Sequence, residues 1–187
     1  MSRRNHLFMV RPKLDGAPDA PLADGFAIRT YRPGDEMAWA AIVRAALDHT
    51  CDENAFAERI ASDEEFLPER VFFALHGDRP VGSAAAFRKT YYGDRTGYVH
   101  MLAVLPAYHG MGLGAALLAA CLDYFERRGW RDAVLDTDAD RLPAIRLYLA
   151  FGFEPVPETP DEFALWKKAL AALDRPDLAA GLKFPPP

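Results

Sequence analysis

Cysteine is scarce in this sequence, and so are two other features that would restrict its function. The 187 residues include only Cys51 and Cys121, which match neither a disulfide framework nor a metal site, so we expect free thiols and no bound metal. No apolar run approaches the ~20 residues of a membrane-spanning helix. The apolar segment after Arg3-Arg4, residues 6–10, is too short for a signal peptide. We therefore expect a cytoplasmic protein that does not bind membranes.

A surplus of basic residues is also missing. The formal net charge is -5 at pH 7, whereas proteins that bind nucleic acids usually carry a basic excess. We therefore expect no nucleic-acid partner. An anionic ligand would have to be held by local features, because the overall charge repels it.

The length suits one domain with a full core. We expect a flexible N-terminal arm at residues 1–24, which is polar and proline-rich, a globular domain at residues 25–170, and a tail at residues 171–187. Within the arm, the apolar patch Leu7–Val10 could add to a sheet edge or to a partner. The oligomeric state is open between a monomer and a homodimer.

One stretch, Tyr98–Ala120, organises the rest of the chain. Residues 98–104 are rich in β-branched and aromatic side chains and predict a strand, and a turn with proline and glycine follows. From Gly112 onward, apolar residues recur every three or four positions and predict a helix with one apolar stripe: Leu113, Leu117, Cys121 and Tyr124.

The glycines at this strand–turn–helix junction indicate an anion site. The first turn of a helix carries backbone N–H groups without partners and a partial positive charge. Gly110, Gly112 and Gly114 lack the Cβ atoms that would keep a ligand away from these amides. A phosphate or diphosphate could therefore bind there. The alternative is a tight connection whose glycines serve only packing.

Around this stretch, hydrophobic periodicity and turn residues predict an alternation of strands and helices. Strands are expected at residues 26–31, 71–76, 80–88, 98–104, 133–137, 153–156 and 163–168. Helices are expected at residues 36–49, 54–61, 112–128 and 142–151. This order predicts an α/β layer around a mixed sheet.

Two interpretations of the anion site compete. The first is a dinucleotide fingerprint, G-x-G-x-x-A, at Gly110, Gly112 and Ala115, with Asp136 placed where a ribose-binding acid is expected. Against it, residues 105–109 separate the first glycine from the strand. The motif also lies too late in a short chain for a doubly wound sheet to follow.

The second interpretation rests on two motifs. Val104-Leu-Pro106 followed by His109-Gly-Met-Gly112-Leu-Gly114 resembles the coenzyme A-binding signature of the GNAT superfamily of N-acetyltransferases, Gln/Arg-x-x-Gly-x-Gly/Ala. Ala144-Ile-Arg-Leu-Tyr-Leu-Ala-Phe-Gly-Phe153 matches a second element of that family, Ala-x-x-Leu-Tyr-x-x-x-Gly-Phe. Both occur in order, and the resemblance spans roughly residues 26–170.

Two residues depart from the family pattern. His109 stands where the signature has Gln or Arg, and Arg141 stands where an Asn is frequent, three residues before Ala144. Neither change removes a backbone amide, so the anion cradle is expected to persist. The role of the usual Asn in the cofactor site is left in doubt.

The resemblance implies the GNAT acyl-CoA N-acyltransferase fold, a mixed and mostly antiparallel sheet flanked by helices on both faces. It implies acetyl transfer from acetyl-CoA to a primary amine by direct attack in a ternary complex, on a small-molecule or peptide acceptor. The residues implied for binding acetyl-CoA are Leu102, Ala103, Val104, His109, Gly110, Met111, Gly112, Leu113, Gly114, Ala115 and Arg141.

Two side chains are candidates for the chemistry. Tyr148 falls on the family's tyrosine position and would protonate the leaving thiolate; the alternative is a half-buried core tyrosine. His100 alternates with Leu102 and Val104, so it is expected to share their face of the strand, and it would accept the proton of the amine. A structural histidine, with water as the base, is the alternative.

Another function class remains open. A GNAT-fold module that holds acyl-CoA without catalysis, as a sensor or a partner subunit, would keep the same cradle. The acceptor is also open, because fold does not choose among amines, although the acidic excess slightly favours a cationic one. Tyr91 and Tyr92 could shape an acceptor pocket.

Overall fold

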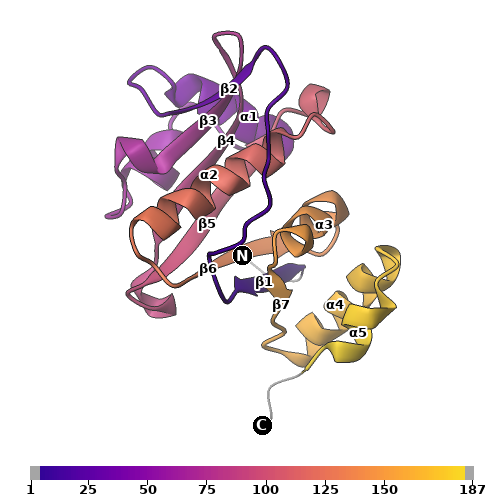
Figure 1. The fold of residues 1–187 in the computed structure, drawn as a ribbon. Coiled ribbons are helices and arrows are strands. Elements are labelled where there is room, and N and C mark those ends of the chain that lie inside the picture. The colour runs from indigo at the N-terminus through magenta and orange to yellow at the C-terminus, as the bar shows by residue number, and fades with distance from the viewer. Residues whose placement is uncertain (1–4, 184–187) are drawn as a thin grey trace.

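The computed structural model describes residues 5–183 and has one seven-stranded sheet with the order β2-β3-β4-β5-β6-β1-β7 (Figure 1). Neighbouring strands pair antiparallel except β5 and β6, which are parallel. The strands are β1 His6–Arg11, β2 Phe26–Thr30, β3 Val71–His76, β4 Arg79–Arg88, β5 Thr96–Val104, β6 Asp132–Asp138 and β7 Glu154–Pro155. This sheet lacks the doubly wound parallel order that a dinucleotide fingerprint requires.

Helices cover both faces of the sheet, as expected. They are α1 Glu36–Ala46, α2 Leu113–Arg127, α3 Leu142–Ala150, α4 Pro160–Ala172 and α5 Pro176–Gly181. One core lies under α1 and contains Trp39, Val43, Phe73 and Phe87. The other lies under α2 and α3 and contains Leu7, Met9, Leu117, Phe125 and Tyr148. None of the helices within residues 5–183 combines the length and apolarity needed to cross a membrane.

The central helix follows its sequence pattern closely. The stripe predicted on α2 is buried, with Leu113, Leu117 and Cys121 at most 1% exposed. The helix ends where Gly129 adopts a positive φ of 71° and donates its N–H to the carbonyl of Glu126 at 2.9 Å. The predicted strand, turn and helix around residues 98–128 are therefore confirmed.

The expectation of a flexible arm is wrong for residues 6–11. These residues form β1, which lies between β6 and β7 inside the sheet. Leu7 and Met9 are fully buried while the intervening residues are half-buried, the alternation expected of a strand packed on one face. The sequence does not show this period of two, because residues 7–10 are all apolar. The prolines that suggested a flexible arm all lie after β1, from Pro12 onward.

Arg11 ties β1 to the end of α3. Its guanidinium donates to the carbonyl of Phe151, just after α3, and to the carbonyls of Leu14 at 3.3 Å and Asp15 at 2.8 Å. Burial lowers the pKa of Arg11. Carbonyls at a helix C-terminus attract a cation, so this buried charge has favourable partners.

The strand expected at residues 163–168 is also wrong, because these residues belong to α4. Thr159 caps this helix, its hydroxyl accepting the N–H of Glu162 at 3.2 Å, and Pro160 occupies the first turn. The carboxylate of Glu162 reaches back to the N–H of Glu158 at 2.8 Å. This capping pattern, T-x-x-E, marks a helix start that outweighs the short apolar run after it.

Shortening a buried side chain of β1 tests whether the strand is docked as described. Met9→Ala should lower the free energy of unfolding by about 2–5 kcal/mol, because a fully buried methionine leaves a cavity. The same change at Met37, which is 60% exposed on α1, is the matched control and should be nearly neutral. Urea denaturation measures both, and equal stabilities would show that β1 is not part of the core.

Candidate active site

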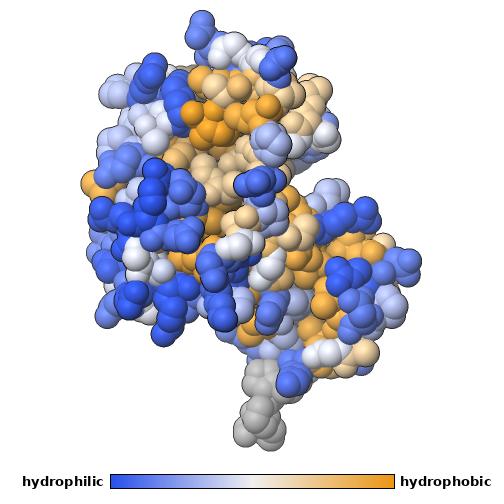
Figure 2. Space-filling view, in the orientation of Figure 1, coloured by the Kyte–Doolittle hydropathy of each residue, from blue (hydrophilic) through white to orange (hydrophobic). Residues whose placement is uncertain are grey.

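The site forms where two parallel strands separate. β5 and β6 pair only from Thr96 with Asp132 to Val99 with Leu135, and beyond that point β6 pairs with β1 alone. A pocket of about 220 Å³ lies at the divergence. Figure 2 shows the surface indented on its right side, where in Figure 1 the start of α2 faces α3. A larger hollow of about 370 Å³ between β7 and α5 includes none of the predicted site residues.

The pocket is reached from both faces of the sheet because the strands have separated. Tyr148 lines it from α3, which packs in the core beneath α2. Tyr98 and His100 line it from β5, and their rings lie on the opposite face, where His100 stacks on Phe87 at 5.6 Å. One pocket therefore joins the expected cofactor side to the α1 side.

A β-bulge in β5 corrects the predicted orientation of His100. The register with β4 shifts between Ser83 and Ala85, and Met101 adopts a positive φ of 52°. Alternation is therefore broken: Val99 and Leu102, three residues apart, both belong to the core under α2. His100 lies on the face opposite Leu102, not on the same face as predicted.

The turn before α2 presents a row of backbone amides. Within residues 5–183, no hydrogen-bond acceptor meets the N–H groups of residues 110–115. Gly110 and Gly112 have positive φ values of 78° and 77°, and a Cβ at either position would contact no other atom within 4 Å. The amides therefore border open space at the positive end of a helix, which fits an anionic group such as a diphosphate.

The side chains of the signature have structural roles beside these amides. His109 Nε2 lies 2.9 Å from the carbonyl of Val104, a contact that ties the turn to the end of β5. Leu113 is buried in the core, whereas Met111 is 46% exposed. A Cβ on Gly114 would lie 3.4 Å from the side chain of Leu147 of α3, an ordinary contact distance, so α2 packs beside α3 at this position. Ala115 is half-buried against the same core.

The end of β5, beyond the last residue that pairs with β6, consists of Leu102, Ala103 and Val104. Leu102 and Ala103 are buried by their side chains in opposite cores. Their backbone on the side facing β6 has no ladder partner in the described sheet, because that pairing ends at Val99. An extended ligand chain could supply the missing hydrogen bonds.

Arg141 lies at the start of α3 and lines the pocket. Its backbone N–H donates to the carbonyl of Asp138 at 3.0 Å, which closes the loop between β6 and α3. The guanidinium has no ion-pair partner among the described residues, and its charge acts on Tyr148. Arg141 thus places a positive charge where the family often has an Asn.

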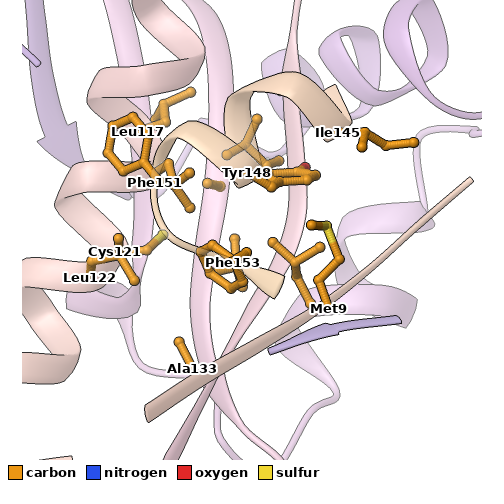
Figure 3. Packing of buried hydrophobic residues seen from close by; sticks show 14 of the residues in the cluster. Met9, Leu117, Cys121, Leu122, Ala133, Ile145, Tyr148, Phe151 and Phe153 are labelled. Atoms are coloured by element: carbon orange, nitrogen blue, oxygen red, sulfur yellow. The ribbon is translucent and has the colours of Figure 1, made fainter. Parts of the chain in front are cut away.

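Tyr148 combines a buried ring with a place on the pocket wall. The residue is 3% exposed, its ring lies 6.0 Å from that of Phe153, and Figure 3 shows it among Phe151, Phe153 and Met9. Burial raises the pKa of its hydroxyl, while Arg141 opposes the rise. The phenol is therefore protonated at neutral pH and can donate a proton into the pocket.

His100 lies on the other side of the pocket. Burial, aided by the charge of Lys89, lowers the pKa of His100 to about 4, while Asp63 acts in the opposite sense. The imidazole is therefore neutral at pH 7 and can accept a proton. Its ring also contacts Tyr98 at 5.3 Å.

Sequence reasoning did not identify a polar group beside His100. Tyr98 donates its hydroxyl to Asp136 at 3.1 Å, and His6 Nδ1 lies 3.5 Å from the other carboxylate oxygen. The sequence suggests a role for Asp136 only as a ribose-binding acid, and His6 lies within the expected arm. The signal that could have found them is the period of two in β1 and β6, which places both residues on one face.

Comparison with known proteins agrees with this geometry. The model of a family described as Acetyltransferase (GNAT) matches residues 37–153. A mycothiol acetyltransferase from Streptomyces bingchenggensis is 36% identical over 141 residues, which cover 73% of this chain and 45% of that relative. A second, from Acidothermus cellulolyticus, is 34% identical over 81% of this chain and 51% of the relative. The chain thus spans about half the length of these curated relatives.

Solved structures share the fold. A GCN5-related N-acetyltransferase from Sphaerobacter thermophilus superposes with a TM-score of 0.64 at 27% identity, over 81% of this chain and 48% of that one. The ribosomal-protein-S18-alanine N-acetyltransferase from Escherichia coli gives 0.60 at 25% identity, over 73% of this chain and 86% of that one. Sequence and structure together establish that the chain belongs to the GNAT acetyltransferase family.

Proposed function

We propose that the chain is an acetyl-CoA-dependent N-acetyltransferase, which moves an acetyl group to a primary amine by direct attack in a ternary complex. The observation that carries the proposal is the row of unpartnered amides at residues 110–115, beside two strands that separate around Tyr148. Acetyl-CoA would supply a diphosphate for the amides, an extended arm for the free edge of β5 and a thioester for the pocket.

The residues around the pocket fit the needs of this reaction. A neutral amine attacks the thioester carbonyl, so that a C–N bond forms, the C–S bond breaks and the amine loses a proton. The backbone N–H groups of residues 102–104 are candidates to stabilise the oxyanion. Tyr148 holds a proton for the leaving thiolate, since burial raises its pKa. His100 is the candidate acceptor of the amine proton, and a water chain is the alternative.

The names of the relatives suggest one acceptor to test first. The two curated relatives described above are named for mycothiol, so mycothiol lacking its acetyl group is a candidate acceptor. The Escherichia coli neighbour is named for the alanine of a ribosomal protein, which makes a peptide N-terminus the second candidate. An assay of the N-acetylated product by mass spectrometry, with a panel of amines, distinguishes these acceptors, because an acceptor that carries a thiol would itself react in an assay of free thiol. It also separates the enzyme from a non-catalytic acyl-CoA-binding module.

The amide cradle can be tested with two glycines of the same helix. Gly112→Ala and Gly129→Ala each place a methyl group at a positive φ with no atom within 4 Å, so both should destabilise the fold by about 1–2 kcal/mol. Only Gly112 lies among the free amides. We expect its replacement alone to weaken acetyl-CoA binding by roughly 10-fold or more, measured by calorimetry. Equal affinities in the two variants would exclude the cradle.

The proposed acid is tested by removing one hydroxyl. Tyr148→Phe should lower turnover by roughly 10- to 1000-fold, the range of one lost proton donor, with acetyl-CoA affinity nearly unchanged. Tyr124→Phe is the control, because the Tyr124 hydroxyl is also buried but accepts from Arg70 Nε at 3.0 Å, away from the pocket. Unchanged turnover in Tyr148→Phe would remove this residue from the mechanism.

The pH dependence tests His100. With a pKa of about 4, the imidazole is the neutral proton acceptor across pH 5–8, and the acidic limb of kcat/KM should fall near pH 4. His100→Gln should lose this limb and lower turnover by roughly 100-fold, whereas the exposed His76→Gln should change neither. If His100→Gln keeps the acidic limb of kcat/KM, His100 is not the base, and water accepts the proton of the amine.

The lowered pKa of His100 also makes the free energy of unfolding depend on pH. Because the unfolded histidine titrates near 6.5, the unfolded chain binds the proton more tightly than the folded one. The wild-type protein should therefore lose stability through His100 as the pH falls from about 6.5 to about 4, and His100→Gln should not show this part of the loss.

A further inference from the structure

Asp136 is a carboxylate at the pocket that has no lysine or arginine partner among the described residues. Its side chain is 21% exposed and lines the pocket from β6. One oxygen accepts the hydroxyl of Tyr98 at 3.1 Å, and the other lies 3.5 Å from the imidazole of His6. Within residues 5–183, no Lys or Arg comes within 4 Å of Asp136.

Other carboxylates that are similarly buried have a lysine or arginine partner. Asp35 meets Arg29 at 2.6 Å, Asp63 pairs with Lys89, and Glu65 pairs with two arginines, Arg70 and Arg88. The side chains of these three acids are 10–14% exposed. A partly desolvated carboxylate is costly unless a cation or several donors compensate it. Asp136, which lacks such a lysine or arginine, can therefore accept a positively charged group of a ligand.

The surroundings of Asp136 suit an organic cation. The ring of Tyr98 lines the pocket, and Tyr92 follows at 6.0 Å with Phe8 stacked on it at 5.1 Å, so an aromatic strip leads away from the carboxylate. The exposed ring of Tyr91 continues the strip at 4.3 Å from Tyr92. Aromatic faces attract ammonium groups and cover the apolar part of an amine.

Two further observations point to a ligand in this pocket. Thr137, 3% exposed, lines the pocket from the other face of β6, where it lies opposite Leu7, and its hydroxyl has no hydrogen-bond partner among the described residues. Asp138 adds a second carboxylate to the lining, on the same face of β6 as Asp136. The positive charge of the pocket, Arg141, lies near Tyr148 instead. Asp136 shares its face of the sheet with the rings of Tyr98 and Tyr92.

We propose that Asp136 binds the acceptor as a cation, so that the substrates are primary ammonium compounds with the charge held against Asp136 and the carbon skeleton against Tyr98 and the aromatic strip. The bound ammonium gives one proton to solvent before it reacts, and the neutral amine then attacks the thioester and loses its second proton as described above. The proposal rests on the proposed acetyltransferase function and gives it a substrate class. His6 and Phe8, which β1 delivers to this face, then belong to the acceptor site.

A pair of nearly isosteric amines tests the charge. 2-Phenylethylamine is a cation at pH 7, whereas O-benzylhydroxylamine has an oxygen in place of one CH₂ and a neutral amine. The panel adds glucosamine and cadaverine as further cations. With acetyl-CoA, we expect higher kcat/KM for a cationic amine than for the neutral isostere. Asp136→Asn keeps an oxygen to accept from Tyr98 and should lower kcat/KM for the cationic amines by roughly 10- to 100-fold, mainly through KM.

Controls separate this inference from the function on which it rests. Asp123→Asn makes the same change on the exposed surface of α2 and should leave all values unchanged. Calorimetry with acetyl-CoA should give the same affinity for wild type and Asp136→Asn; no binding to the wild type would overturn the proposed function. Binding of acetyl-CoA without turnover of any amine would overturn the proposed acetyltransferase function. Turnover of the neutral isostere alone, a preference for it, or an equal loss for both amines in Asp136→Asn would overturn the inference alone.

Discussion

The early end of pairing between β5 and β6 is the constraint on which the rest of the site depends. Parallel neighbours in a sheet normally continue their ladder, but here it ends at Val99 and Leu135. The backbone of β5 beyond that point still needs hydrogen-bond partners, and a gap through the sheet remains. The same divergence brings Tyr148 from one face and His100 from the other to one pocket.

Two local features keep the strands apart. The bulge at Met101 changes the direction of β5, since a bulged strand bends and twists more than a regular one. On the other side, β1 pairs with β6 along its whole length, from Ala133 to Asp138, and holds it in its own direction. The glycine-rich turn then begins α2 at the open end of the gap, so that its free amides border the same opening.

The sequence predicts the elements that depend on neighbouring residues better than those that depend on distant ones. The glycines at 110, 112 and 114 and the apolar stripe of α2 are short-range signals, and the structure places them as predicted. The orientation of His100 depends on a bulge, which one extra residue creates against β4 and which no pattern within β5 reveals. The strand β1 depends on partners far along the chain. For α4, the capping signal at Thr159 is local, but the short apolar run after it is also typical of a strand.

Charge is arranged locally in a protein whose total charge is negative. The amides of residues 110–115 and Arg141, which acts on Tyr148, provide positive potential without changing the acidic balance of the chain. Asp136 lies on the opposite face of the sheet, where it accepts the hydroxyl of Tyr98. Such a separation favours an anionic molecule on one face and a cationic molecule on the other, because each is attracted by the charge that it meets there.

The position of β1 has a consequence for synthesis of the protein. Residues 6–11 are synthesised before their neighbours in the sheet, β6 and β7, which lie more than ~120 residues later. Contacts so distant in sequence are slow to form, because the entropy cost of closing a long loop comes before the contacts can stabilise the fold. Leu7 and Met9 therefore stay uncovered until β6 has been made, and in that interval a nascent protein with this order offers an apolar strand to chaperones.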